Sequence, residues 1–138
     1  IDHVNAYLAI EKARFAERLQ VTIKCDDAAM SALLPSFTLQ PLVENAVKHG
    51  IAQRIEGGHL TLNVRCTTDN HIHILVEDNA GLYKPKKEQH AGLGMDIVDK
   101  RLIHQFGQQA GLVIECRTNQ FTRMSFSIPH THYHSHQG

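Results

Sequence analysis

The stretch that decides the fold is residues 39–50, LQPLVENAVKHG. Its apolar residues recur at helical spacing, which predicts a helix from about residue 38 to residue 49 that ends at Gly50. Each residue turns a helix by roughly 100°, so Asn45 and His49 stack along one flank of the apolar stripe. Glu44 can pair with Lys48, four residues on. A polar cluster therefore lies at the edge of a predicted core.

Two interpretations of this cluster are open from the segment alone. In the ordinary one, the helix simply ends in a polar turn, where Lys48 and His49 suit the helix dipole. In the functional one, the amide oxygen of Asn45 is a ligand suited to Mg²⁺, which usually shares phosphate oxygens and keeps several waters. Lys48 and His49 could then face those phosphates.

Length and composition narrow the class of protein. The chain has 138 residues, the size of one domain, and its 14 basic residues balance its 14 acidic residues. This balance argues against a general attraction to nucleic acid or to anionic membranes. The 3 cysteines form no Cys-x-x-Cys pair, which favours reduced thiols in a cytosolic protein. The chain opens directly in a helical pattern at Ile1, so we expect a piece of a longer protein.

The order of the predicted elements indicates the fold class. Strands that alternate apolar and polar residues need helices on one face only. The sequence therefore predicts a two-layer α/β sandwich with a mixed, largely antiparallel sheet covered on one face by helices. In chain order, the elements are a helix at 2–19, a strand at 20–25, a helix at 38–49, strands at 59–66 and 71–78 joined by a turn at 67–70, a helix at 94–107, and strands at 111–116 and 122–129.

Two later segments also have a functional and an ordinary interpretation. ILVEDNAGLY, residues 74–83, runs a buried strand into Asp78, whose carboxylate could accept a hydrogen bond from an amine such as adenine N6. The ordinary alternative is a turn. HAGLGMDIV, residues 90–98, places Gly92 and Gly94 before a helix start, where backbone N–H groups can receive an anion. The ordinary alternative is a hinge.

Taken together, the three segments resemble a known family. Their order is similar to the N, G1 and G2 boxes of the GHKL, or Bergerat-type, ATP-binding fold of histidine kinases, gyrase, the Hsp90 chaperones and the MutL repair proteins. LQPLVENAVKHGI looks like the N box of LytS-type sensor histidine kinases, and most like that of the YpdA and YehU group. YLAIEKARFAERLQV (7–21), VEDNAGLY (76–83) and GLGMDIVDKRL (92–102) fit the same group, so the resemblance spans roughly residues 4–129.

The resemblance implies a role for particular residues. Asn45 would be the catalytic metal ligand, holding the Mg²⁺ that bridges the ATP phosphates, and Asp78 would bind the adenine amine. Residues 83–91 would form a lid, whose Lys84, Lys86 and Lys87 either reach phosphate or form an ordinary solvated loop. The implied ATP-binding residues are Asn45, Lys48, His49, Asp78, Asn79, Gly81, Gly92, Leu93, Gly94 and Met95.

Several positions depart from the family pattern. The usual G1 pattern is Asp-x-Gly-x-Gly, but Ala80 and Leu82 stand at the two glycine positions here, so the turn must differ or nucleotide affinity drops. Ile97 stands where the family often has Asn, and no F box is clear. Relatives that hydrolyse ATP with water carry a Glu at the position of Pro41, so activation of water is not expected.

The resemblance implies a function for the whole piece. The phosphoacceptor motif of LytS-type kinases, similar to His-Phe-x-Phe-Asn, does not occur in these residues. We expect residues 1–19 to end a dimerisation helix, residues 20–129 to form the ATP-binding catalytic domain of a two-component sensor histidine kinase, and residues 130–138 to be a disordered His-rich tail. ATP and Mg²⁺ would be the cofactors. The enzyme would deliver the γ-phosphate to a His on a separate dimerisation domain.

The expected partners are that phosphoacceptor domain and a cognate response regulator, with no nucleic acid. The whole protein would be a homodimer of the bacterial inner membrane, and this domain would be cytoplasmic.

Other interpretations stay open from the sequence. The domain could be a scaffold or partner-docking module in which the altered G1 turn has weakened nucleotide binding. A serine kinase of the anti-sigma type is a third interpretation, against which the N-terminal helix and the N box argue. The tail, with His130, His132, His134 and His136 at alternate positions, either binds a transition metal or is a disordered end with adventitious affinity.

Overall fold

The computed structural model describes residues 2–25, 36–83 and 95–129. A five-stranded sheet has the order β1-β2-β3-β5-β4. β1 pairs in parallel with β2, and the other three pairs are antiparallel. The predicted mixed, largely antiparallel sheet is thus confirmed. The strands are β1 (Leu19–Cys25), β2 (Gly58–Cys66), β3 (His71–Asp78), β4 (Val113–Arg117) and β5 (Phe121–Pro129).

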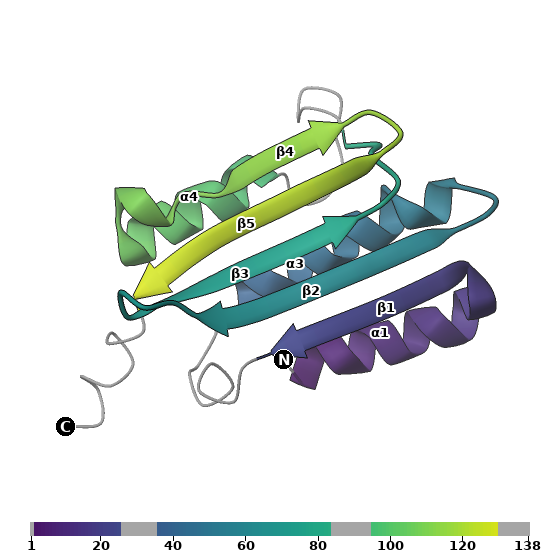
Figure 1. Cartoon of the computed structure of the whole chain (residues 1–138), viewed down its shortest axis with the longest axis horizontal. Coiled ribbons are helices and arrows are strands. Elements are labelled where there is room, and N and C mark those ends of the chain that lie inside the picture. The colour runs from purple at the N-terminus through teal and green to yellow at the C-terminus, as the bar shows by residue number, and fades with distance from the viewer. Residues whose placement is uncertain (1, 26–35, 84–94, 130–138) are drawn as a thin grey trace.

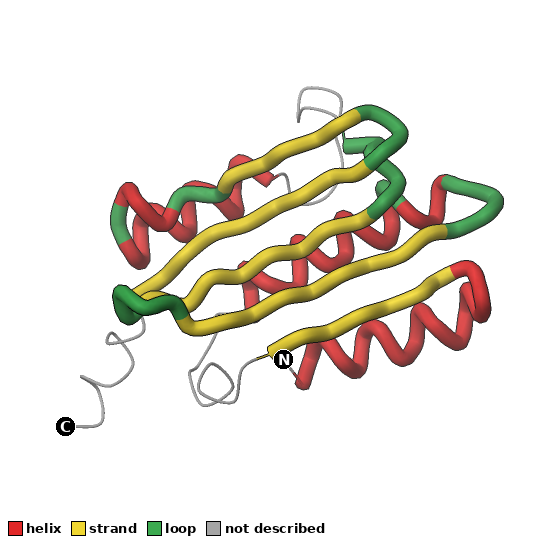
Figure 2. The backbone as a smooth tube through the Cα atoms, viewed as in Figure 1, coloured by secondary structure: helices red, strands yellow, loops and turns green. Residues whose placement is uncertain are grey.

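The helices α1 (Asp2–Phe15), α3 (Ser36–Lys48) and α4 (Met95–Phe106) lie together on one face of this sheet (Figure 1). α3 is the middle helix and contacts both α1 and α4. The tube view in Figure 2 shows the same two layers, with the helices in red behind the strands in yellow. The predicted two-layer sandwich is confirmed. None of the helices in the described part of the chain has both the length and the apolar character that a membrane span requires.

The core forms between the sheet and the helices because strand residues alternate between the two faces. In β3, Ile72, Ile74 and Val76 are buried on the side of the helices, and the next residue in this row is Asp78, which is also buried. Asp78 pairs with Thr122 of β5, the other buried polar residue of the sheet. A buried carboxylate therefore continues an apolar row at the end of β3, and this placement builds the site.

The element bounds differ from the predicted ones mainly near the N-terminus. The predicted helix at 2–19 is too long: α1 ends at Phe15, a 3-10 turn covers Ala16–Arg18, and Leu19 begins β1. Ala16 has a positive φ of 53°, which a continuing α-helix does not tolerate. Leu19 lies four residues after Phe15 and fits a helical stripe, but its pairing with Gly58 places it in the sheet. The other bounds differ by one or two residues.

Candidate nucleotide-binding site

Asp78 places a carboxylate in the described core, since only 3% of the residue is exposed. Its Oδ1 accepts hydrogen bonds from the backbone N–H groups of Ala80, at 2.9 Å, and Gly81, at 3.1 Å. Burial raises the pKa of the Asp78 carboxyl above its ordinary value, while these N–H groups and that of Thr122 act in the opposite direction. The carboxyl group is therefore desolvated and held in one orientation.

Gly50 brings the end of α3 against this carboxylate. A Cβ atom at Gly50 would lie 3.0 Å from Asp78 Oδ2 and 2.6 Å from the carbonyl oxygen of Ala46. Only a glycine allows so close an approach. Nothing in the sequence marks this contact, because the helical pattern gives Gly50 only the role of ending the helix. On the Gly50 side, Oδ2 of the carboxylate therefore faces backbone.

The turn after Asp78 depends on one glycine. Gly81 has φ +66°, and a Cβ there would lie 2.4 Å from the carbonyl oxygen of Arg117 in the β4–β5 hairpin. Ala80 is fully buried, and neither Ala80 nor Leu82 has a positive φ. The departures from the family pattern therefore have a structural account: the left-handed residue of this turn is at position 81, and the side chain of Ala80 packs inside the core.

Asn79, predicted to bind nucleotide, uses its side chain within the protein. Its Oδ1 accepts a hydrogen bond from the N–H of His59 at 2.8 Å, at the start of β2. Its carbonyl oxygen accepts a hydrogen bond from Arg54 at 2.8 Å, and the same guanidinium pairs with Glu56 at 2.6 Å. The loop between α3 and β2 therefore holds the turn that follows Asp78. Arg54 carries no sequence signal for this role.

Asn45 is buried on α3, with 8% of the residue exposed. Within the described ranges its side-chain amide makes no hydrogen bond to another residue. The preceding residue, Glu44, lies near Tyr7 of α1, because, in addition to burial, its carboxylate raises the pKa of that tyrosine, and helical geometry turns Asn45 roughly 100° away from Glu44. Its amide oxygen is therefore available to a ligand.

The neighbours of Asn45 on α3 have a different environment. Lys48 and His49 are both exposed. Lys48 Nζ lies 3.8 Å from Glu44 Oε1, which confirms the predicted pair. The structure therefore buries Asn45 but leaves the two predicted phosphate contacts at the surface.

Some of the remaining residues predicted to contact the nucleotide lie in the part of the chain that the structure describes, and others do not. Met95 begins α4 and is 2% exposed, so its side chain belongs to the core. Tyr83, the first residue of the predicted lid, is half-buried against the core; burial raises its pKa, as does the nearby Asp96. The predictions for Lys84, Lys86, Lys87, Gly92, Leu93, Gly94 and the His-rich tail concern residues outside the described part of the chain.

The fold and the site together define a class of protein: a two-layer α/β sandwich in which the end of the middle helix meets a buried strand-end carboxylate. Residues 30–132 match the family model described as histidine kinase-, DNA gyrase B-, and HSP90-like ATPase. The chain belongs to this family, and its predicted membership is confirmed.

Particular relatives are sensor kinases. The chain is 46% identical over 129 residues to sensor histidine kinase BtsS of Escherichia coli (strain K12), which covers 94% of the chain and 23% of the relative. It is 32% identical over 133 residues to sensor histidine kinase/phosphatase LytS of Staphylococcus aureus (strain MRSA252), covering 88% of the chain and 23% of the relative. The chain thus spans less than a quarter of the length of these relatives.

Solved structures share the fold. The histidine kinase domain of the blue-light activated kinase from Erythrobacter litoralis EL346 matches with a TM-score of 0.68 and 19% identity, over 93% of this chain and 63% of that chain. Full-length ShkA in complex with AMPPNP matches with a TM-score of 0.61 and 14% identity, over 91% and 29%. The predicted ATP-binding catalytic domain of a sensor histidine kinase is confirmed by the family and the relatives.

Proposed function

We propose that this domain binds Mg·ATP, with Asp78 accepting a hydrogen bond from the adenine amine and Asn45 holding the metal ion. In the whole protein the domain delivers the γ-phosphate to a His on a separate dimerisation domain. The observation that carries this proposal is the buried Asp78 carboxylate beside the bare backbone of Gly50.

The geometry of Asp78 supports the adenine role. Its Oδ1 is committed to the N–H groups of Ala80 and Gly81, which fixes the plane of the carboxylate. A Cβ at Gly50 would lie 3.0 Å from its Oδ2, so the glycine leaves that oxygen uncovered by any side chain at position 50. An acceptor at this place favours adenine, which carries an amine, over guanine, which carries a carbonyl oxygen at the same position.

The donor set supports Mg²⁺ as a metal shared with phosphate. Among the described residues, no group of three or more His, Cys, Asp or Glu side chains could hold a metal ion. A single amide oxygen at Asn45 suits a Mg²⁺ ion that takes its other ligands from phosphates and water. When bound, the ion would neutralise phosphate charge. We assign further phosphate contacts to Lys48, to His49 and to the backbone of residues 92–95.

The same residues support transfer rather than hydrolysis. Phosphoryl transfer needs positioning and charge neutralisation more than covalent chemistry from the protein. Pro41, inside α3, has no basic side chain to activate water. The domain alone would therefore bind ATP without consuming it.

A structural neighbour supports the proposed partners. Histidine kinase ThkA has been solved in complex with response regulator protein TrrA, and its kinase chain matches this one with a TM-score of 0.60, 14% identity and coverage of 95% of this chain and 40% of that chain. We assign to the whole protein a dimeric kinase of the bacterial inner membrane, with this domain on the cytoplasmic side and a cognate response regulator as its target.

Titration calorimetry with ATP tests the metal role. Asn45→Ala should weaken ATP binding at least tenfold in Mg²⁺, about 1.4 kcal/mol, but much less in EDTA. Asn63→Ala, a half-buried residue of β2, is the matched control and should bind like the unmodified domain. Equal losses with and without Mg²⁺ would contradict the assignment of Asn45. No measurable ATP binding by the unmodified domain would favour a docking module instead.

A further inference from the structure

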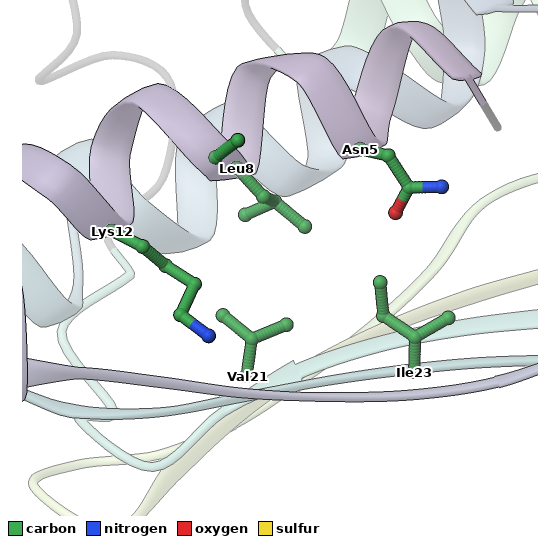
Figure 3. Close-up of a pocket in the computed structure, with 6 residues that line it drawn as sticks. Asn5, Leu8, Lys12, Val21 and Ile23 are labelled. Atoms are coloured by element: carbon green, nitrogen blue, oxygen red, sulfur yellow. The ribbon is translucent and has the colours of Figure 1, made fainter.

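A groove lies between α1 and β1 at the edge of the sheet. Its volume is about 320 Å³, at the small end of protein sites that hold a ligand. Figure 3 shows side chains from α1 pointing towards those of β1 across this space. The lining residues are Asn5, Leu8, Ala9 and Lys12 from the helix and Val21 and Ile23 from the strand.

β1 is an edge strand. It pairs only with β2, so on its other side alternate backbone N–H and C=O groups have no partner strand among the described residues. The strand also exposes an apolar side chain, since Ile23 is 38% exposed. Free edges with apolar neighbours are templates for an added strand. A strand added here would direct every second side chain into the groove.

The charges at this edge favour a partner with acidic side chains. The ammonium of Lys12 lines the groove and makes no ion pair with a carboxylate of the described residues. β1 contains Lys24 and no acidic residue. Glu11, next to Lys12, is buried and lies 3.7 Å from Arg14. A carboxylate on the incoming strand would therefore meet uncompensated positive charge.

The same charges argue against a second copy of this chain as the occupant. Pairing β1 with another β1 would bring further ammonium groups, from Lys24 and Lys12, to a strand whose seven residues include no Asp or Glu. Like charges placed opposite each other across strands are destabilising.

We propose that the groove between α1 and β1 binds an extended, acidic peptide segment. The segment adds a strand to the free edge of β1, places aliphatic side chains against Leu8, Val21 and Ile23, and presents an Asp or Glu carboxylate to Lys12. Main-chain hydrogen bonds to the edge supply affinity, and the groove supplies specificity. β1 has seven residues, so a matching segment of about seven residues would span about 23 Å.

This site is separate from the proposed nucleotide site. α1 and β1 lie on one side of α3, whereas α4 lies on the other (Figure 1). Occupying the groove therefore leaves Asn45 and Asp78 accessible, and a groove variant should keep its ATP affinity. The two proposals can fail independently.

The test uses a labelled octapeptide that alternates valine and threonine and has one central glutamate, with a twin that has lysine in its place. Fluorescence anisotropy should show saturable binding of the glutamate peptide and at least tenfold weaker binding of the lysine peptide. Lys12→Glu should reverse this preference, whereas Lys100→Glu, the same change on exposed α4, should not. Ala9→Phe, which fills the groove from the exposed face of α1, should abolish binding.

Amide NMR signals complete the test, because they locate the peptide. Changes confined to residues 5–12 and 19–25 are expected on adding the glutamate peptide. Equal affinity for the two peptides, or changes centred elsewhere, would overturn the proposal. Self-association of the unmodified domain in sedimentation experiments that Ala9→Phe abolishes would also overturn it, because the occupant would then be a second copy.

Discussion

Polar groups are buried on both sides of helix α3, but the two sides differ in how many hydrogen bonds these groups accept or donate. Near its end, Asp78 is buried and its Oδ1 accepts two backbone hydrogen bonds. On the α1 side, the Tyr7 hydroxyl and Glu11 Oε2 are buried and have no hydrogen-bond partner in the described part of the chain. Burial alone therefore does not identify a functional site. A candidate binding group is one whose orientation is fixed by the protein and whose free side meets open backbone, as Asp78 does beside Gly50.

The α1 side shows the energetic cost of burying polar groups without well-placed partners. Glu11 is 4% exposed, and its nearest cation, the exposed Arg14 guanidinium, is 3.7 Å away. Burial raises the pKa of Tyr7, and the carboxylates of Glu11 and Glu44 raise it further. An unsatisfied buried polar group costs about 1–3 kcal/mol. The contact between α1 and α3 is therefore less stable than an apolar contact of the same shape would be.

The largest effect is expected at the turn that organises Asp78. Gly81→Ala should lower the free energy of unfolding by about 3 kcal/mol, because it adds left-handed backbone strain to overlap with the Arg117 carbonyl oxygen. Gly107→Ala is the control: its φ is also positive, at +104°, but the atom nearest its Cβ would be in the flexible side chain of Gln109, at 3.2 Å. Urea denaturation should show a loss of about 1 kcal/mol there. Similar losses in the two variants would mean that the hairpin does not constrain the turn.

The next largest effect is expected in the ATP affinity of an Asp78 variant that keeps the hydrogen bonds of the turn. Asp78→Asn keeps an acceptor for Ala80 and Gly81 but places an amide where the adenine amine is expected, so ATP affinity should fall at least tenfold, about 1.4 kcal/mol. The preference for ATP over GTP should fall as well. Asp99→Asn is the matched control, because Asp99 Oδ1 accepts a 2.7 Å bond from the N–H of Leu112 in a structural role. Comparable ATP and GTP affinities in the unmodified domain would contradict the adenine role.

The stability of Asp78→Asn should depend on pH in a defined direction. Burial raises the folded-state pKa of Asp78, so the folded state binds the proton more tightly than the unfolded state. The resulting stabilisation is full below about pH 4 and is lost as pH rises through the raised pKa. Asn does not titrate, so the unfolding free energy of the variant should rise relative to that of the unmodified domain between about pH 4 and pH 7. The opposite trend in urea titrations would show that hydrogen bonding outweighs burial.

The smallest effect lies on the other side of α3. Tyr7→Phe removes a buried hydroxyl that has no hydrogen-bond partner among residues 2–25, 36–83 and 95–129, so it should raise the free energy of unfolding by about 1 kcal/mol and leave ATP affinity unchanged. Tyr83→Phe serves as the stability control, since the Tyr83 hydroxyl is not among the buried unpartnered atoms of the described residues. A destabilised Tyr7→Phe variant in thermal denaturation would indicate an ordered water bound to this hydroxyl, and the two sides of α3 would then be alike.

Much of the fold follows from local pattern. Alternation in residues 59–66 and 71–78 predicts two strands that the structure confirms, and the turn at 67–70 joins them. The Glu44–Lys48 pair was likewise predictable, because four residues along a helix bring two side chains together. Leu19 shows the limit of this reasoning: its spacing fits the preceding helical stripe, but pairing with Gly58 decides its conformation.

The sequence by itself determined which face of each strand and helix is buried, because that information repeats every two or every three to four residues. It also marked Asn45 and Asp78 through family resemblance. Only the tertiary structure decided that β5 lies between β3 and β4, that Gly50 touches Asp78 and that Asn79 is tied to His59. It also decided that Glu11 Oε2 is buried without a hydrogen bond among the described residues. These contacts join segments far apart in the chain, and their distances depend on strand register and helix packing, which no local pattern encodes.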